Sequence, residues 1–329
     1  MDIARFEPGL AAEPPPSVEL PSTERQRFGV EPVQGRHDLA DHPLFADAAL
    51  ARLLDGFPRE HLQAHCSGSD PARLSDNHRV DLGDVDGAAL LRAVRRGRLW
   101  LNLTRVDRID AGYRQLIDQL YEQLVILLPG FAPEASQGTL LISSPSAQVY
   151  YHADAPPSVL WHLRGRKRVW IYPHHDVRYL DPRHLEDIFA GVRHEYLPYQ
   201  PGYDTAAIVH DLAPGQWLAW PQNAPHRVSN LDGLNVSLAT EHHTAHSRRR
   251  FRTQVANRFL RTRLGIRELS TETEGAMALA KTLTQRVARR LGLDPLTVHH
   301  QPPTRRLVLP ADGEAHEIEV LRSRPEVLA

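Results

Sequence analysis

The chain has 329 residues and a formal net charge of −1, from 39 basic and 40 acidic side chains. A charge this balanced argues against a protein whose overall field draws it to nucleic acid or to an anionic membrane. A single cysteine, Cys66, excludes an intrachain disulfide and a thiolate zinc cluster, and it fits a reducing compartment.

The sequence also lacks the signals of a membrane or secreted protein. No stretch approaches the roughly 20 apolar residues that a membrane span needs. The first residues contain no basic segment followed by an apolar run. We therefore expect a soluble, cytoplasmic protein with no membrane partner, built on one main core with additions.

The first 130 residues predict an arm followed by a helical region. Residues 1–40 contain the run Pro14-Pro15-Pro16 and few apolar clusters, so we expect an extended, partly disordered arm. In residues 41–130 apolar side chains recur at spacings of three and four, which predicts helices that pack on the core. Asp110 is a good N-cap for one of them. The expected helices cover residues 42–56, 86–97 and 110–128.

Between residues 131 and 245 the pattern changes to short β-prone runs bounded by Pro, Gly, Asn and Asp. This rhythm is typical of an antiparallel barrel or a double-sheet jelly roll, a group that includes the cupins. One helix is expected within it, over residues 181–190. The predicted strands are Thr139 to Ile142, Gln148 to Tyr151, Val159 to Leu163, Arg168 to Tyr172, Ala206 to Leu212, Gln216 to Trp220 and Leu234 to Thr240.

The last region, residues 246–329, returns to a helical period and ends in two alternating runs. Arginines between residues 248 and 252 are expected on a solvated helix face, so we do not expect a nucleic-acid partner. The expected elements are helices over 247–263 and 273–291 and a terminal hairpin with strands at 306–309 and 317–321.

Two residues in the β-rich region have the spacing of metal ligands. An iron(II) oxygenase site needs two imidazoles and one carboxylate on one face of the metal, so that positions stay open for a co-substrate and oxygen. Residues i and i+2 of an extended chain point to the same side, so His152 and Asp154 can supply two ligands from one strand end. The same spacing occurs in His174-His175-Asp176 and, with a glutamate, in His184-Leu185-Glu186.

Lys167 distinguishes the first motif from the other two. It stands at the start of a predicted strand, thirteen residues after Asp154. A cation there could hold the distal carboxylate of a keto acid whose other end chelates the metal. The other two motifs have Phe189 and Tyr199 at this spacing, and neither side chain can do so.

His226 is the predicted third ligand. It follows a strand that contains Trp217 and Trp220 and a bend that contains Pro221 and Pro225. Proline restricts its own φ angle and the residue before it, so the bend should hold His226 with little conformational freedom. A metal site requires a rigid ligand of this kind.

The order of these motifs resembles the Jumonji-C, or cupin-like, branch of the 2-oxoglutarate-dependent oxygenases. The shared pattern is His-x-Asp, then Gly-x-Lys on the following strand, then a Pro-Gly and Trp-Pro segment that ends in Pro-His before a closing strand. The resemblance covers about residues 138–242. Within this range the sequence is similar to the asparaginyl hydroxylase of hypoxia-inducible factor. It implies a mainly β fold, with a double-stranded β-helix (cupin or jelly-roll) core at 131–245 and α-helical additions at both ends.

The resemblance also implies the residues of the site. Two positions depart from the family: Val149 stands where a co-substrate hydroxyl is frequent, and Ala239 stands where an amide is expected. The implied residues are His152, Asp154 and His226 for Fe(II), and Lys167 and Ser158 for 2-oxoglutarate.

The implied reaction hydroxylates a carbon of a protein or peptide side chain, or of a small metabolite, using O2 and releasing succinate and CO2. By analogy with related hydroxylases, the C-terminal helices would pair two subunits. Two alternatives stay open: a non-catalytic cupin-like module that binds a metal or ligand in regulation, and a cupin metalloenzyme that does not use 2-oxoglutarate. A further histidine group, at His242, His243 and His246, could suggest a second metal site, but we expect surface or core residues there.

Overall fold

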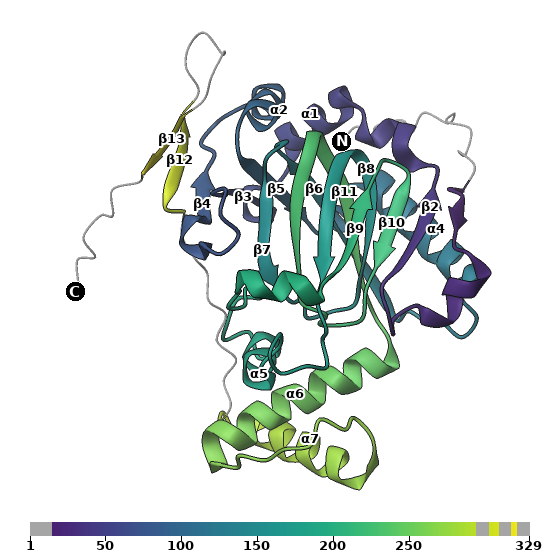
Figure 1. Ribbon diagram of the computed structural model, residues 1–329, viewed down its shortest axis with the longest axis vertical. Coiled ribbons are helices and arrows are strands. Elements are labelled where there is room, and N and C mark those ends of the chain that lie inside the picture. The colour runs from purple at the N-terminus through teal and green to yellow at the C-terminus, as the bar shows by residue number, and fades with distance from the viewer. Residues whose placement is uncertain (1–14, 294–302, 309–316, 321–329) are drawn as a thin grey trace, which may run out of the picture.

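The core of the protein is a jelly roll of mostly antiparallel strands, surrounded by helices from both ends of the chain (Figure 1). A computed structural model describes residues 15–293, 303–308 and 317–320. The prediction of a mainly β core with helical additions is therefore confirmed. The strands are β1 Val18–Glu19, β2 Val33–His37, β3 Leu62–Cys66, β4 His78–Asp81, β5 Leu99–Thr104, β6 Ala135–Ser143, β7 Gln148–His152, β8 Ser158–Ile171, β9 Ile208–Leu212, β10 Gln216–Ala219, β11 His226–His243, β12 Arg305–Val308 and β13 Glu317–Val320.

Two long strands, β8 and β11, take part in both layers of the roll. The first half of β8 pairs with β10 and the second half of β11, whereas the second half of β8 pairs with β9 and the first half of β11. Gly165 and Gly233, with φ angles of 76° and 64°, lie where the β8–β11 register shifts. The structure thus joins two predicted strands into β8. Residues from both halves of the two strands line one cavity.

The N-terminal segment adds strands to one edge of the sheet. β2 pairs with β10 in antiparallel register, and Trp217 of β10 lies opposite Gly35. A Cβ atom on Gly35 would come within 2.4 Å of the Trp217 ring, so glycine allows the indole to lie against the β2 backbone. The Trp217 Nε1–H donates to the carbonyls of Glu19 and Arg36. The described part of the predicted arm is therefore tied to the core.

The opposite edge is extended by β5, β3 and β4, which the sequence analysis did not predict. The sheet continues from β6 through β5 and β3 to β4. Strand β5 alternates strictly: Leu99, Leu101 and Leu103 are fully buried, whereas Trp100 and Asn102 face the cavity. The prediction of a purely helical region at 41–130 is therefore wrong, because it contains three strands that form one wall of the central pocket.

The helices pack around the sheet, with α5, α6 and α7 gathered at one end and α1 and α2 at the other (Figure 1). Asp110 caps α4 as predicted, because its carboxylate accepts from the backbone N–H groups of Gly112 and Tyr113. None of the described helices is long and apolar enough to cross a membrane. The α-helices are α1 Asp47–Gly56, α2 Gly87–Arg96, α3 Val106–Ile109, α4 Ala111–Leu127, α5 Pro182–Phe189, α6 Ala245–Leu264 and α7 Gly275–Arg290. Short 3-10 helices cover Ser22–Arg27, Leu39–Asp41, Pro43–Phe45, Arg59–His61, Leu74–Asp76 and Pro201–Ala206.

The C-terminal elements agree with the predicted types. α6 begins at a capping box in which Thr244 and Ser247 satisfy each other's backbone N–H groups. Strands β12 and β13 pair antiparallel, as expected for a hairpin, and β12 also pairs in parallel with β4. Residues 309 and 321, the predicted ends of the two hairpin strands, lie outside the described residues.

Candidate metal centre and its pocket

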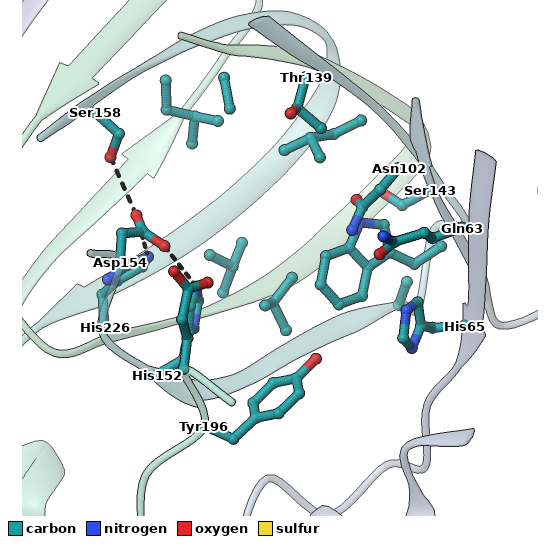
Figure 2. A pocket seen from close by; sticks show the side chains of 18 of the residues that line it. Gln63, His65, Asn102, Thr139, Ser143, His152, Asp154, Ser158, Tyr196 and His226 are labelled. Carbon is teal, nitrogen blue, oxygen red and sulfur yellow. Dashed lines mark hydrogen bonds and ion pairs between the residues drawn. The ribbon is translucent and has the colours of Figure 1, made fainter. Parts of the chain in front are cut away.

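The structure brings His152, Asp154 and His226 together at the end of β7 and the start of β11. The two strands pair so that His152 lies directly opposite His226. The Nε2 atoms of His152 and His226 lie 3.5 and 3.6 Å from the two carboxylate oxygens of Asp154 (Figure 2). One ligand atom from each residue lies within 4.8 Å of the others, a spacing that a single metal ion can bridge.

Backbone carbonyls fix which nitrogen of each histidine faces Asp154. The Nδ1 atom of His152 lies 2.7 Å from the Tyr150 carbonyl oxygen, and that of His226 lies 3.0 Å from the Ala224 carbonyl oxygen. A carbonyl only accepts, so Nδ1 carries the proton and the Nε2 lone pair is free for a metal. Burial lowers the pKa of His226 to about 4, which keeps its imidazole neutral at pH 7.

The carboxylate of Asp154 is held by Ser158, the first residue of β8. The Ser158 hydroxyl donates to Asp154 Oδ2 at 3.1 Å, and Ser158 also lines the pocket (Figure 2). The sequence analysis expected Ser158 beside the co-substrate, and the structure places its hydroxyl against the predicted ligand. Ser158 can therefore orient Asp154 as well as contact a molecule in the pocket.

Lys167 lies in the same cavity, which has a volume of about 420 Å³. Only 4% of Lys167 is exposed, and burial lowers the pKa of its ammonium group to about 7. No described carboxylate lies within ion-pair distance of Lys167, whereas its neighbour Arg168 pairs with Asp211 on the opposite face of β8. A buried cation without an acidic partner can bind an anion that enters the cavity.

A polar wall on β3 and β5 faces the three candidate ligands across the pocket. Figure 2 shows Gln63, His65 and Asn102 on this side, with Tyr196 between them and His152. The Oδ1 atom of Asn102 has no hydrogen-bond partner among the described residues, so it can accept one from a bound molecule. Sequence reasoning missed this wall, although the strict alternation of β5 is a signal that could have revealed it.

The other histidine groups do not form a second cluster. His242 is buried; its Nδ1 lies 3.2 Å from the Tyr121 hydroxyl, and its ring packs edge-on against Phe131. His174 and His175 pack on each other with ring centroids 3.6 Å apart. Within the described ranges, His152, Asp154 and His226 are the one group of three or more candidate ligand side chains close enough to share an ion.

Comparison with known proteins agrees with this architecture. Residues 96–244 match the family of cupin-like domains. An X-ray structure of E. coli ycfD is 15% identical, covers 85% of this chain and 69% of its own, and superposes with a TM-score of 0.50. At this identity the likeness concerns the fold. No curated protein matches the sequence.

Two other structures of the E. coli protein superpose less well. One, described as the ribosomal oxygenase YcfD, is 14% identical over 83% of this chain and 68% of its own, with a TM-score of 0.45. Another, in complex with cobalt and 2-oxoglutarate, is 16% identical over 84% and 68%, with a TM-score of 0.41.

Proposed function

Because residues 96–244 match the family of cupin-like domains, we propose that this protein is an Fe(II)- and 2-oxoglutarate-dependent oxygenase that hydroxylates a carbon atom of its substrate. The observation that carries the proposal is that a His-Asp-His group and a buried lysine share one cavity. The histidine group fits a metal, and the lysine fits the free end of a dicarboxylate.

His152, Asp154 and His226 would hold the iron. Two imidazoles with free Nε2 lone pairs and one carboxylate are the ligand set that non-haem iron(II) oxygenases use, and this set leaves positions open on the metal. Bound iron would supply the oxidising chemistry, in which a C–H group, O2 and 2-oxoglutarate become a C–OH group, succinate and CO2. Asp154 fills the carboxylate position, so we expect hydroxylation or demethylation rather than halogenation.

Lys167 would bind the distal carboxylate of 2-oxoglutarate. The ammonium group of Lys167 is buried, and the pocket that it lines contains apolar side chains such as Val149, Leu160 and Val228 beside polar ones. Burial away from water strengthens a charged hydrogen bond. The lysine would thereby orient the co-substrate with its keto-acid end toward the metal.

The polar wall on β3 and β5 would face the substrate. Gln63 and Asn102 offer hydrogen-bonding groups in a cavity of about 420 Å³, a size that suits one side chain or a small molecule. We favour a protein or peptide side chain and keep a small metabolite as the second candidate.

We further propose a cytoplasmic homodimer that pairs through the C-terminal helices. Leu279, Leu283 and Val287 lie four residues apart on α7 and are 60%, 48% and 57% exposed. A stripe of this kind is what a second copy of α7 could cover. The half-buried thiol of Cys66 has no disulfide partner, which suits a reducing compartment.

Uncoupled turnover tests the proposed activity without a known substrate. Purified protein loaded with Fe(II) would be incubated with 2-oxoglutarate and O2, and succinate would be measured. We expect slow succinate formation that Asp154→Ala abolishes and that Asp176→Ala, in a rival motif, leaves unchanged. Equal succinate formation by wild type and Asp154→Ala would contradict the proposal. A wild type that binds iron but forms no succinate would favour the non-catalytic cupin-like module.

A further inference from the structure

We propose that Asn223 is a positioning residue that joins the two ligand-bearing segments of the metal centre, and that Arg250 of α6 sets the orientation of its amide. This inference rests on the proposed metal site. It assigns a role to the bend before His226 and to the first turns of the C-terminal helix.

The backbone of Asn223 shapes the bend that carries His226. The Ala224 N–H donates to the Pro221 carbonyl at 2.9 Å, which closes a tight turn with Asn223 inside it. Asn223 has a φ angle of 65°, a left-handed conformation that asparagine tolerates better than most residues. The next residue, Ala224, presents the carbonyl that lies 3.0 Å from Nδ1 of His226. The turn therefore orients the third ligand.

The side chain of Asn223 holds the segment that carries Asp154. Its Nδ2 group donates to the Asp154 carbonyl at 2.7 Å and lies 3.2 Å from the Ala155 carbonyl. Gln222 donates to the Ala155 carbonyl as well, at 2.9 Å. Asp154 follows the end of β7, so these bonds replace the strand pairing that no longer supports it. One buried residue, 1% exposed, thus contacts both ligand segments.

Arg250 determines which way the Asn223 amide points. The Arg250 Nε–H donates to Asn223 Oδ1 at 2.9 Å. A guanidinium group only donates and a carbonyl only accepts. The amide oxygen must therefore face Arg250, and the amide NH2 must face Asp154. Among the described residues, no carboxylate forms an ion pair with Arg250, so its contact with Asn223 is not shared with an acidic partner.

It follows that α6 helps to position the metal centre. A continuous path of hydrogen bonds runs from Arg250 through Asn223 to the backbone of Asp154. Groups that orient metal ligands from outside typically change metal affinity by about 10- to 100-fold when they are removed. We expect an effect in that range for Asn223 and a smaller one for Arg250, which acts through it.

Metal affinity measured on folded variants tests this role. Asn223→Gly keeps the left-handed backbone and removes the amide, and Asn235→Gly is its matched control. Asn235 of β11 is also buried, and its Nδ2 group donates to the carbonyls of Asp232 and Gly233. It is not one of the residues that line the pocket. Dissociation constants for Co(II) would be measured by competition with a chelator, and the melting temperature of each apo protein would be recorded.

We expect both glycine variants to lower the melting temperature, but only Asn223→Gly to weaken Co(II) binding, by about tenfold or more. Arg250→Met should weaken Co(II) binding less, and Arg250→Lys, which keeps a donor, should restore it in part. If folded Asn223→Gly binds Co(II) as tightly as wild type, or if Asn235→Gly loses as much Co(II) affinity as Asn223→Gly, the role of Asn223 is wrong but the proposed metal site stands. A wild-type protein that binds no Co(II) would overturn the proposed metal site as well.

Discussion

Replacing Lys167 with methionine removes a buried cation while keeping an unbranched side chain of similar length. If the distal carboxylate of 2-oxoglutarate pairs with Lys167, the substitution leaves that carboxylate buried without a partner. Removing one member of a buried ion pair costs about 3–5 kcal/mol. The pKa of Lys167 is about 7, so protonating it at pH 7 offsets only about 0.4 kcal/mol of this energy. The remaining energy, at least about 2.6 kcal/mol, corresponds to a loss in affinity of roughly 100-fold or more.

The assay is anaerobic calorimetry of 2-oxoglutarate binding to Fe(II)-loaded protein. Arg166→Met is the matched control, because Arg166 is the exposed neighbour on the other face of the strand. We expect about 100-fold weaker binding in Lys167→Met, unchanged binding in Arg166→Met and full iron content in both. Equal 2-oxoglutarate affinity in wild type and Lys167→Met would refute the role of Lys167.

The pH dependence gives an independent readout of the same group. Burial lowers the pKa of free Lys167 to about 7, so above pH 7 the empty protein has a neutral lysine. Binding an anion then requires uptake of one proton, and wild-type affinity should fall by up to about tenfold per pH unit above pH 7. Lys167→Met should not show this slope. The charged form opposes folding most strongly below pH 7, so apo Lys167→Met should also melt at a higher temperature than wild type.

Three further predictions concern the metal, the dimer and the core. His152→Ala and Asp154→Ala should each remove most of the iron from folded protein; metal analysis that finds wild-type iron content would exclude the site. Leu283→Glu should convert a dimer into a monomer in light scattering, and a wild type that is itself monomeric would refute the pairing. Gly35→Ala places a Cβ against Trp217 and should lower the free energy of unfolding by about 1–3 kcal/mol; a urea melt that matches wild type would contradict this packing.

The strands and helices of the jelly roll could be predicted from the sequence where they depend on neighbouring residues alone. The β-prone runs became β6 to β11, and the cap at Asp110 is present as predicted. β11 is longer than expected, since the register shift near Gly233 lets one strand pair with both layers. That pairing depends on contacts far apart along the chain, which periodicity does not record.

The strands β2, β3 and β4 show the limit of local patterns. β2 contains Gly35 in its middle, which weakens a strand in isolation, and it forms because Trp217 packs against that glycine. β4 is short and contains His78 and Arg79, so it lacks an alternating apolar pattern, and β3 alternates only over the five residues Leu62–Cys66. Their place is decided by pairing, since β3 lies between β4 and β5. The alternation of β5 was readable but was not used.

Some residues of the candidate site could likewise be predicted from local patterns, and others could not. His152, Asp154 and His226 could be proposed because their spacing and the proline bend are local features, and Lys167 because its distance from Asp154 is fixed by one strand. Asn223 could not be recognised, since its role depends on a contact with Arg250, 27 residues away in another element. The polar wall was missed because the alternation of β5 was not used.

The most direct test of the account is an anaerobic titration of Fe(II)-loaded wild-type protein with 2-oxoglutarate, followed by visible absorption. Bidentate chelation of Fe(II) by a keto acid produces a weak metal-to-ligand charge-transfer band. The account predicts that this band appears and saturates at one 2-oxoglutarate per iron. Iron that stays bound while no band develops would contradict an oxygenase site and would favour a cupin-like protein that does not use this co-substrate.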